Sequence, residues 1–112
     1  MKTNFDKINP KKVLGYLMAS ALVFFTGSVT AQTNHDVFID SQTNTFAPAS
    51  LTIDVGDQVT FINDGGYHNV NGDLSTYPNN ADGSMYSGAA SNSLTTYVWV
   101  CTTAGNYDYQ CD

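Results

Sequence analysis

Short apolar runs separated by Gly, Asn, Asp and Pro make up the chain from Asp36 onward. The runs are rich in β-branched and aromatic residues, and their apolar positions recur at every second residue. This alternation predicts strands with one buried face, and no stretch of useful length has helical periodicity. We therefore expect an all-β domain. The expected strands cover residues 37–39, 51–55, 59–62, 93–101 and 107–111.

The second and third expected strands are predicted to form a hairpin over residues 51–63. Residues 51–55 and 59–62 alternate in polarity on either side of the turn signal Gly56-Asp57. Residues 47–49 precede this hairpin and are expected to be an extended connection, because Pro48 cannot donate a hydrogen bond within a central strand.

A second hairpin is predicted to join residues 93–101 to residues 107–111 across the turn Gly105-Asn106. Alternation places aromatic and thiol side chains on the inward face of both strands. These inward residues are Tyr97, Trp99, Cys101, Tyr107, Tyr109 and Cys111. The Tyr107 hydroxyl is expected to hold the preceding loop, as tyrosine corners do.

Between the hairpins, residues 71–92 form a long polar stretch with few apolar anchors, among them Met85. The stretch is too long for a turn and is expected to be irregular. Several short strands separated by turn signals are typical of a Greek-key β-sandwich. The sequence therefore predicts that fold.

The amino end has the pattern of a signal peptide over residues 1–31. Four lysines lie within the first 12 residues, an apolar run covers residues 13–25, and Val29-Thr30-Ala31 offers small residues for cleavage after Ala31. The apolar run is shorter than the roughly 20 residues of a membrane-spanning helix. We expect an exported protein, periplasmic or extracellular, that is not inserted in a membrane after cleavage.

The distribution of charged residues along the chain limits the kinds of partner that the protein can bind. All Lys and Arg residues lie before residue 31, whereas nine of the ten acidic residues follow it. The remaining chain, with a formal charge of about −9, would repel nucleic acid and anionic lipid. Redox proteins with a basic docking face are the expected partners.

Three sequence motifs follow one another in a characteristic order along the chain. They are Leu51-Thr-Ile-Asp-Val-Gly-Asp-Gln-Val-Thr-Phe61, His68-Asn69-Val70 and Gly105-Asn-Tyr-Asp-Tyr-Gln-Cys111. In this order they resemble the plastocyanin-like cupredoxins, the small blue copper proteins. The resemblance covers almost all of residues 32–112 and implies a cupredoxin-like sandwich.

The resemblance also implies the residues of a type 1 copper site. His68 would be the first imidazole ligand and Cys111 the thiolate, while Asn69 would tie the ligand loops together through hydrogen bonds. A thiolate, two imidazoles and a weak fourth ligand suit both oxidation states of copper. We therefore expect a blue copper protein that carries single electrons.

Two features depart from the family's pattern. The second histidine, the axial methionine and the last strand of the sandwich are expected beyond Asp112. Residues 32–112 are thus expected to be an incomplete domain from a longer gene product. In addition, Gln110 stands where plant plastocyanins carry a tyrosine used in docking and electron exit.

The candidate residues also have simpler interpretations. Cys111 could pair with Cys101, but the two are offset in the expected hairpin, which fits disulfide geometry poorly. Cys101 is expected to be a small core residue. His35 is expected to be exposed near the mature amino end.

The alternative function is a metal-free cupredoxin-like module for binding or adhesion at the cell surface, because a fold alone does not establish copper binding. An enzyme is not expected. The sequence shows no catalytic triad of nucleophile, base and orienting residue, and no carboxylate pair lies in an evident pocket signature. A copper oxidase would need further histidine clusters.

Overall fold

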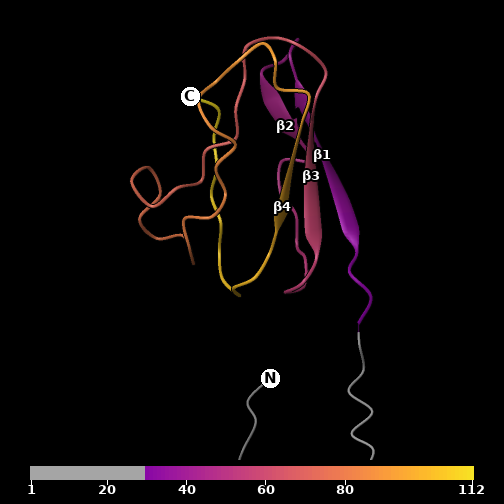
Figure 1. Cartoon of the computed structure of the whole chain (residues 1–112), viewed down its shortest axis with the longest axis vertical. Helices are drawn as coiled ribbons and strands as arrows, with labels where there is room; N and C mark the ends of the chain where they lie inside the picture. Colours follow the sequence, from indigo (N-terminus) through magenta and orange to yellow (C-terminus); the bar gives the residue numbers. More distant parts are fainter. Residues whose placement is uncertain (1–29) are drawn as a thin grey trace, which may run out of the picture.

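The computed structural model describes residues 30–112, and this part of the chain contains strands and no helix, as predicted (Figure 1). The strands are β1 (Asn34–Asp40), β2 (Thr45–Ala47), β3 (Gln58–Asn63) and β4 (Thr96–Val100). They form one mixed sheet in the order β2-β1-β3-β4. β1 is parallel to β3, whereas β2 and β4 are antiparallel to their neighbours.

Nothing in residues 30–112 forms a helix with the length and hydrophobicity needed to cross a bilayer. The predicted signal peptide, residues 1–31, lies outside the described residues except for its last two.

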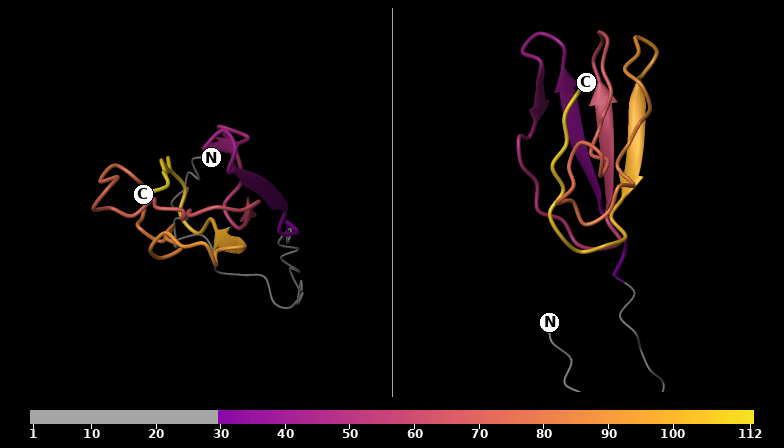
Figure 2. Two further views of the ribbon diagram at one scale, coloured as in Figure 1. Left: turned by 90° about the horizontal axis from the view of Figure 1, so that it is seen from above. Right: turned by 90° about the vertical axis from the view of Figure 1, so that its left-hand side faces the viewer.

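Extended segments form the second layer of the sandwich and face the sheet. In Figure 2 (right) the carboxyl-terminal segment, in yellow, lies in front of the four strands. Isolated backbone bridges join Asn71 to Tyr86 and to Gln110, and His68 to Ser91. The expected cupredoxin-like β-sandwich is confirmed, although regular strands are found only in the first layer.

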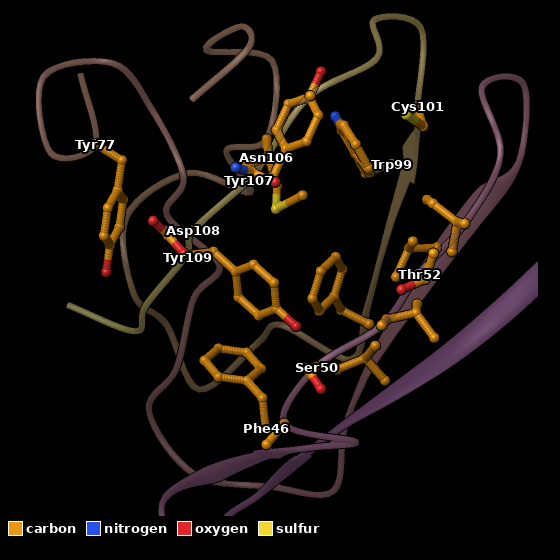
Figure 3. A pocket seen from close by; sticks show the side chains of 18 of the residues that line it. Phe46, Ser50, Thr52, Tyr77, Trp99, Cys101, Asn106, Tyr107, Asp108 and Tyr109 are labelled. Atoms are coloured by element: carbon orange, nitrogen blue, oxygen red, sulfur yellow. The ribbon is translucent and has the colours of Figure 1, made fainter. Parts of the chain in front are cut away.

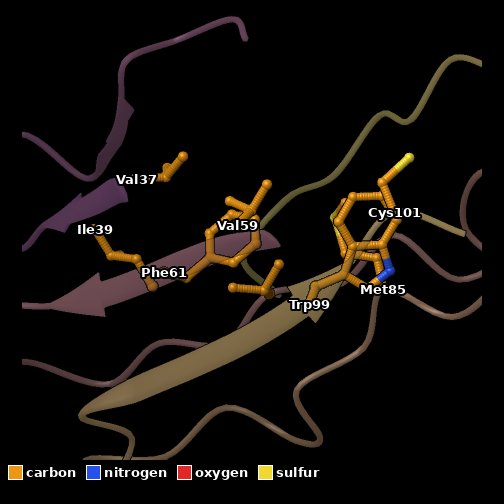
Figure 4. Packing of buried hydrophobic residues seen from close by; sticks show 8 residues of the cluster. Val37, Ile39, Val59, Phe61, Met85, Trp99 and Cys101 are labelled. Atoms are coloured by element: carbon orange, nitrogen blue, oxygen red, sulfur yellow. The ribbon is translucent and has the colours of Figure 1, made fainter. Parts of the chain in front are cut away.

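The core lies between the two layers (Figure 4). Alternate positions of β1, β3 and β4 point into it, and the second layer contributes Val70 and Met85. The buried apolar residues are Val37, Ile39, Val59, Phe61, Val70, Met85, Trp99 and Cys101. The predicted inward face of residues 97–101 is therefore correct, because Trp99 and Cys101 are buried and Tyr97 packs against them.

Aromatic contacts connect the layers around a cavity of about 870 Å³ (Figure 3). The Trp99 and Tyr107 rings are 4.7 Å apart between centroids, and the Phe61 and Tyr109 rings are 5.2 Å apart. Phe46 of β2 meets Tyr109 edge to face at 4.9 Å. These aromatic contacts, together with the buried apolar residues contributed by both layers, hold the second layer to the sheet.

The predicted hairpin over residues 51–63 is wrong. β3 is flanked by β1 on one side and by β4 on the other, with Phe61 opposite Val37 and Tyr97. Residues 51–55 therefore cannot pair with β3, and they lie outside the sheet. Only the turn is as expected, since the Asp57 amide bonds the Asp54 carbonyl at 3.0 Å.

The expected connection at residues 47–49 is also partly wrong, because residues 45–47 form β2. After β1, the Asp40 carboxylate accepts hydrogen bonds from the backbone amides of Gln42 and Thr43. Asn44 then adopts a left-handed φ of 54°, and the chain turns back along β1. The sequence pattern missed this strand because it has only three residues.

The second predicted hairpin, between residues 93–101 and 107–111, is wrong as well. β4 pairs with β3, and residues 107–111 cross to the second layer. There Gln110 exchanges backbone hydrogen bonds with Asn71 at 2.8 and 3.0 Å. The buried Asn80 side chain bonds the amide and the carbonyl of Asp108, both at 2.8 Å. Backbone groups that a partner strand would have satisfied are thus satisfied by the 71–80 loop.

Tyr107 holds the preceding loop, as predicted. Its hydroxyl lies 2.9 Å from the Thr103 carbonyl and 2.8 Å from the Asp82 carboxylate. Hydrogen bonds from the Ser84 side chain and amide, with a smaller one from Tyr107, lower the pKa of Asp82 to about 2. Burial, followed by the Asp82 carboxylate, raises the pKa of Tyr107 to about 12. The ionised Asp82 carboxylate therefore stabilises the folded state.

Asp82→Asn is expected to abolish the part of stability that depends on this ionisation. Folding lowers the pKa of Asp82 from 3.8 to about 2. The stability that the ionised Asp82 contributes is therefore fully present above the pKa of the unfolded state and is lost as the pH falls through the pKa of the folded state. The difference in free energy of unfolding between wild type and variant should thus shrink between pH 4 and pH 2. Urea unfolding at a series of pH values measures it. A difference that stays constant over this range would contradict the role of Asp82.

Candidate metal centre

His68 lies in a tight loop at the end of β3. Gly65 and Gly66 precede it with φ values of 142° and 86°, and its backbone exchanges hydrogen bonds with Ser91. A Cβ atom on Gly66 would lie only 3.0 Å from His68 Nε2. Glycine is therefore needed at position 66 for both its backbone conformation and its small size. The loop holds the mostly buried imidazole with Nδ1 toward Cys111.

Cys111 brings its sulfur to the same place from the carboxyl-terminal segment. Its Sγ lies 3.5 Å from His68 Nδ1, and the Asn69 amide donates to the same sulfur at 3.4 Å. The bridge between Asn71 and Gln110 sets the position of the segment. The structure thus brings together two residues that are 43 positions apart in sequence.

Asn69 is fully buried between the loops that meet at this site. Its side-chain amide donates to the Gly88 carbonyl and to the Asp112 carboxylate, both at 2.9 Å. Its carbonyl oxygen accepts the backbone N–H of Asp112, also at 2.9 Å. Asn69 therefore connects three segments of chain around the Cys111 sulfur.

Asn71 and Asp112 also belong to this network, and sequence reasoning missed them. Asn71 Nδ2 lies 3.0 Å from each carboxylate oxygen of Asp112, and the Gln110 side-chain amide donates at 3.1 Å. Hydrogen bonds from Asn69, then Asn71, then Gln110 lower the pKa of Asp112. The available signal was the spacing of Asn69 and Asn71, since residues two apart in an extended segment share one face.

The two donor atoms fit a single metal ion. With bonds of about 2.3 Å to sulfur and about 2.0 Å to nitrogen and a near-tetrahedral angle, the donors of one zinc ion lie roughly 3.5 Å apart. The observed separation of Sγ and Nδ1 is 3.5 Å. Both residues also line a cavity of about 510 Å³ together with Tyr67 and Phe46. The residues present therefore suit a soft or borderline ion such as copper.

The described residues offer two such donors. No group of three or more His, Cys, Asp or Glu side chains within residues 30–112 is arranged to hold a metal ion. A trigonal copper site needs one more strong ligand than His68 and Cys111 supply.

Cys101 takes no part in this centre. Both cysteines are free, and Cys101 is buried in the core, where burial raises the pKa of its thiol. Because Val100 pairs with Gln58 at the start of β3, Cys101 lies at the opposite end of the sheet from the His68 loop. This agrees with its predicted role as a small core residue.

The expectation that His35 is exposed is wrong. His35 lies within β1 and is half-buried, and its Nε2 is 2.9 Å from the Asp57 carboxylate. This hydrogen bond, followed by one from the Thr33 amide, lowers the pKa of Asp57. Period-two alternation put residue 35 on the inward face, and the parallel pairing of β1 with β3 brought it to Asp57.

Comparison with known proteins gives one match. The family model of copper binding proteins of the plastocyanin/azurin family matches residues 33–112. No match was found among curated proteins or among solved structures.

Proposed function

This chain belongs to the plastocyanin/azurin family of copper binding proteins, and we propose that it is an exported one-electron carrier whose copper is bound by His68 and Cys111. The observation that carries the proposal is the 3.5 Å separation between His68 Nδ1 and Cys111 Sγ at one end of the sandwich. Membership of this family supports the more general statement that the chain is a copper-binding protein of the electron-transfer type.

When bound, copper would supply the one-electron couple. The chain's own contribution is to hold the ligands still, because a site that moves little between oxidation states transfers electrons with little reorganisation. The backbone of Ser91 exchanges hydrogen bonds with that of His68, and the backbone N–H of Asn69 donates a hydrogen bond to the Cys111 sulfur. Ligand orientation fixed by such surrounding hydrogen bonds is a general property of metal sites.

Copper titration of the purified full gene product tests the proposal. The protein is tested as its gene encodes it, because a trigonal copper site needs one more strong ligand than His68 and Cys111 supply. We expect one copper(II) ion per chain and an intense visible absorption from thiolate-to-copper charge transfer. A folded protein that stays colourless would overturn the proposal and leave the metal-free binding module in its place.

We further propose that residues 1–31 direct export and are then removed. Support comes from the lysine-rich start, the apolar run at residues 13–25 and the small residues before Gln32. Amino-terminal sequencing of the exported protein should give Gln32 first. A product that still carries Met1 would contradict this assignment.

The partner that we propose is a redox protein with a basic docking face. Support comes from the charge of the chain after residue 31, which contains nine carboxylate side chains and no Lys or Arg. Attraction between opposite charges speeds encounter, and salt screens it over roughly 8 Å at physiological ionic strength. Stopped-flow association with such a partner should therefore slow steeply as salt rises. A rate that does not depend on salt would count against charge steering.

A further inference from the structure

We propose that Asp112 is a positioning residue of the metal centre whose fixed carboxylate favours copper(II) over copper(I) and so lowers the reduction potential. This inference rests on the proposed function, because it assumes that Cys111 binds copper. It concerns a residue that the ligand pattern of the sequence did not single out.

The first observation is how firmly the Asp112 side chain is held. Three side-chain amides donate to its carboxylate, from Asn69 at 2.9 Å, Asn71 at 3.0 Å and Gln110 at 3.1 Å. Its backbone N–H also donates to Asn69 Oδ1 at 2.9 Å. The carboxylate is therefore held in place rather than free to turn into solvent.

The second observation is the surroundings of this charge. Asn69 is fully buried and Asn71 is 6% exposed, so two of the three amides that hold the carboxylate lie inside the protein. Asp112 itself is exposed, so its influence depends on the carboxylate being fixed on these buried amides beside the Cys111 segment rather than on its own burial. No Lys or Arg in residues 32–112 is available to neutralise it.

The third observation is the connection to the sulfur. Asn69 donates its backbone N–H to Cys111 Sγ at 3.4 Å and its side chain to Asp112. The Asp112 carboxylate thus acts in two ways. It orients Asn69 against the sulfur, and it places a negative charge one residue from the ligand. A nearby negative charge stabilises the more positive copper(II) state relative to copper(I).

The test compares Asp112→Asn with the matched variant Asp108→Asn in the copper-loaded full gene product. Both residues are exposed, and both variants remove one negative charge near Cys111 in sequence. The Asp112 carboxylate accepts hydrogen bonds from three side-chain amides, whereas that of Asp108 makes no hydrogen bond within residues 30–112. The readouts are the reduction potential and the visible absorption. We expect Asp112→Asn to raise the potential, with the ratio of copper(II) to copper(I) affinity falling about tenfold or more. For Asp108→Asn we expect a change of less than about threefold.

A third variant, Asn71→Ala, keeps the charge and releases the carboxylate from one amide. Its potential should shift in the same direction as that of Asp112→Asn, but by less. If Asp112→Asn cannot retain copper, the sign of the Asn71→Ala shift decides the inference, and an unchanged or lowered potential overturns it.

The outcomes separate the two proposals. If wild type shows the visible band and Asp112→Asn shifts the potential no more than Asp108→Asn does, the role of Asp112 is overturned and the copper assignment stands. If wild type forms no coloured copper complex, the proposed function fails and the role of Asp112 fails with it.

Discussion

Cys111→Ser is expected to abolish the visible thiolate-to-copper absorption of the copper-loaded full gene product. The absorption requires a thiolate bound to the ion, and Cys111 is the cysteine whose sulfur lies 3.5 Å from the His68 imidazole. A serine hydroxyl is a hard oxygen donor that does not replace a soft thiolate for copper. Titration with copper(II), followed by visible absorption, measures the loss.

Cys101→Ser provides the matched control. Its thiol is free and buried at the other end of the sheet, where it donates to the Thr103 carbonyl at 3.5 Å. A serine hydroxyl can make the same hydrogen bond, so the band should remain. A band that survives Cys111→Ser but is lost in Cys101→Ser would refute the assignment of the thiolate ligand.

Phe61→Ala is expected to cost about 3–5 kcal/mol of unfolding free energy, the range of large-to-small substitutions in cores. Phe61 lies in the middle of β3, is 1% exposed and contacts the rings of Phe46, Tyr97 and Tyr109. Its loss would remove contacts both within the sheet and between the layers. Since small domains have about 5–15 kcal/mol in total, this loss is a large share of the stability, and the variant should unfold at a much lower urea concentration than wild type. Urea unfolding followed by fluorescence measures the change.

Phe38→Ala is the control for this effect. Phe38 lies on the neighbouring β1 strand but is 49% exposed on the outer face of the sheet. Removing it should cost less than about 1 kcal/mol. Equal losses in the two variants would mean that the sheet does not bury its inner face as the structure shows.

Alternation in the sequence predicted the sides of the strands correctly. Tyr97 and Trp99 of β4 and Cys101 directly after it point inward, and Tyr107 and Tyr109 pack against the core from the second layer. This success has a local cause, because successive side chains of an extended chain point to opposite sides whatever the chain pairs with.

The same pattern predicted the wrong strand partners. Both expected hairpins joined neighbours in sequence, but β3 pairs with β1 and β4, and residues 107–111 lie on the 71–80 loop. Pairing depends on which edges are free once the layers form, and this is a property of the whole fold. The parallel contact between β1 and β3 in particular leaves no mark in a local pattern.

For the candidate metal centre, the types of donor and the loop that carries one of them could be predicted from local features of the chain. The glycine pair before His68 and the thiol of Cys111 are local features that can be seen without coordinates. The 3.5 Å separation of Nδ1 and Sγ, and the presence of Asn71 and Asp112 beside them, become visible in the folded chain alone. A distance between residues 43 positions apart depends on how the two layers pack, and no spacing along the chain encodes that packing.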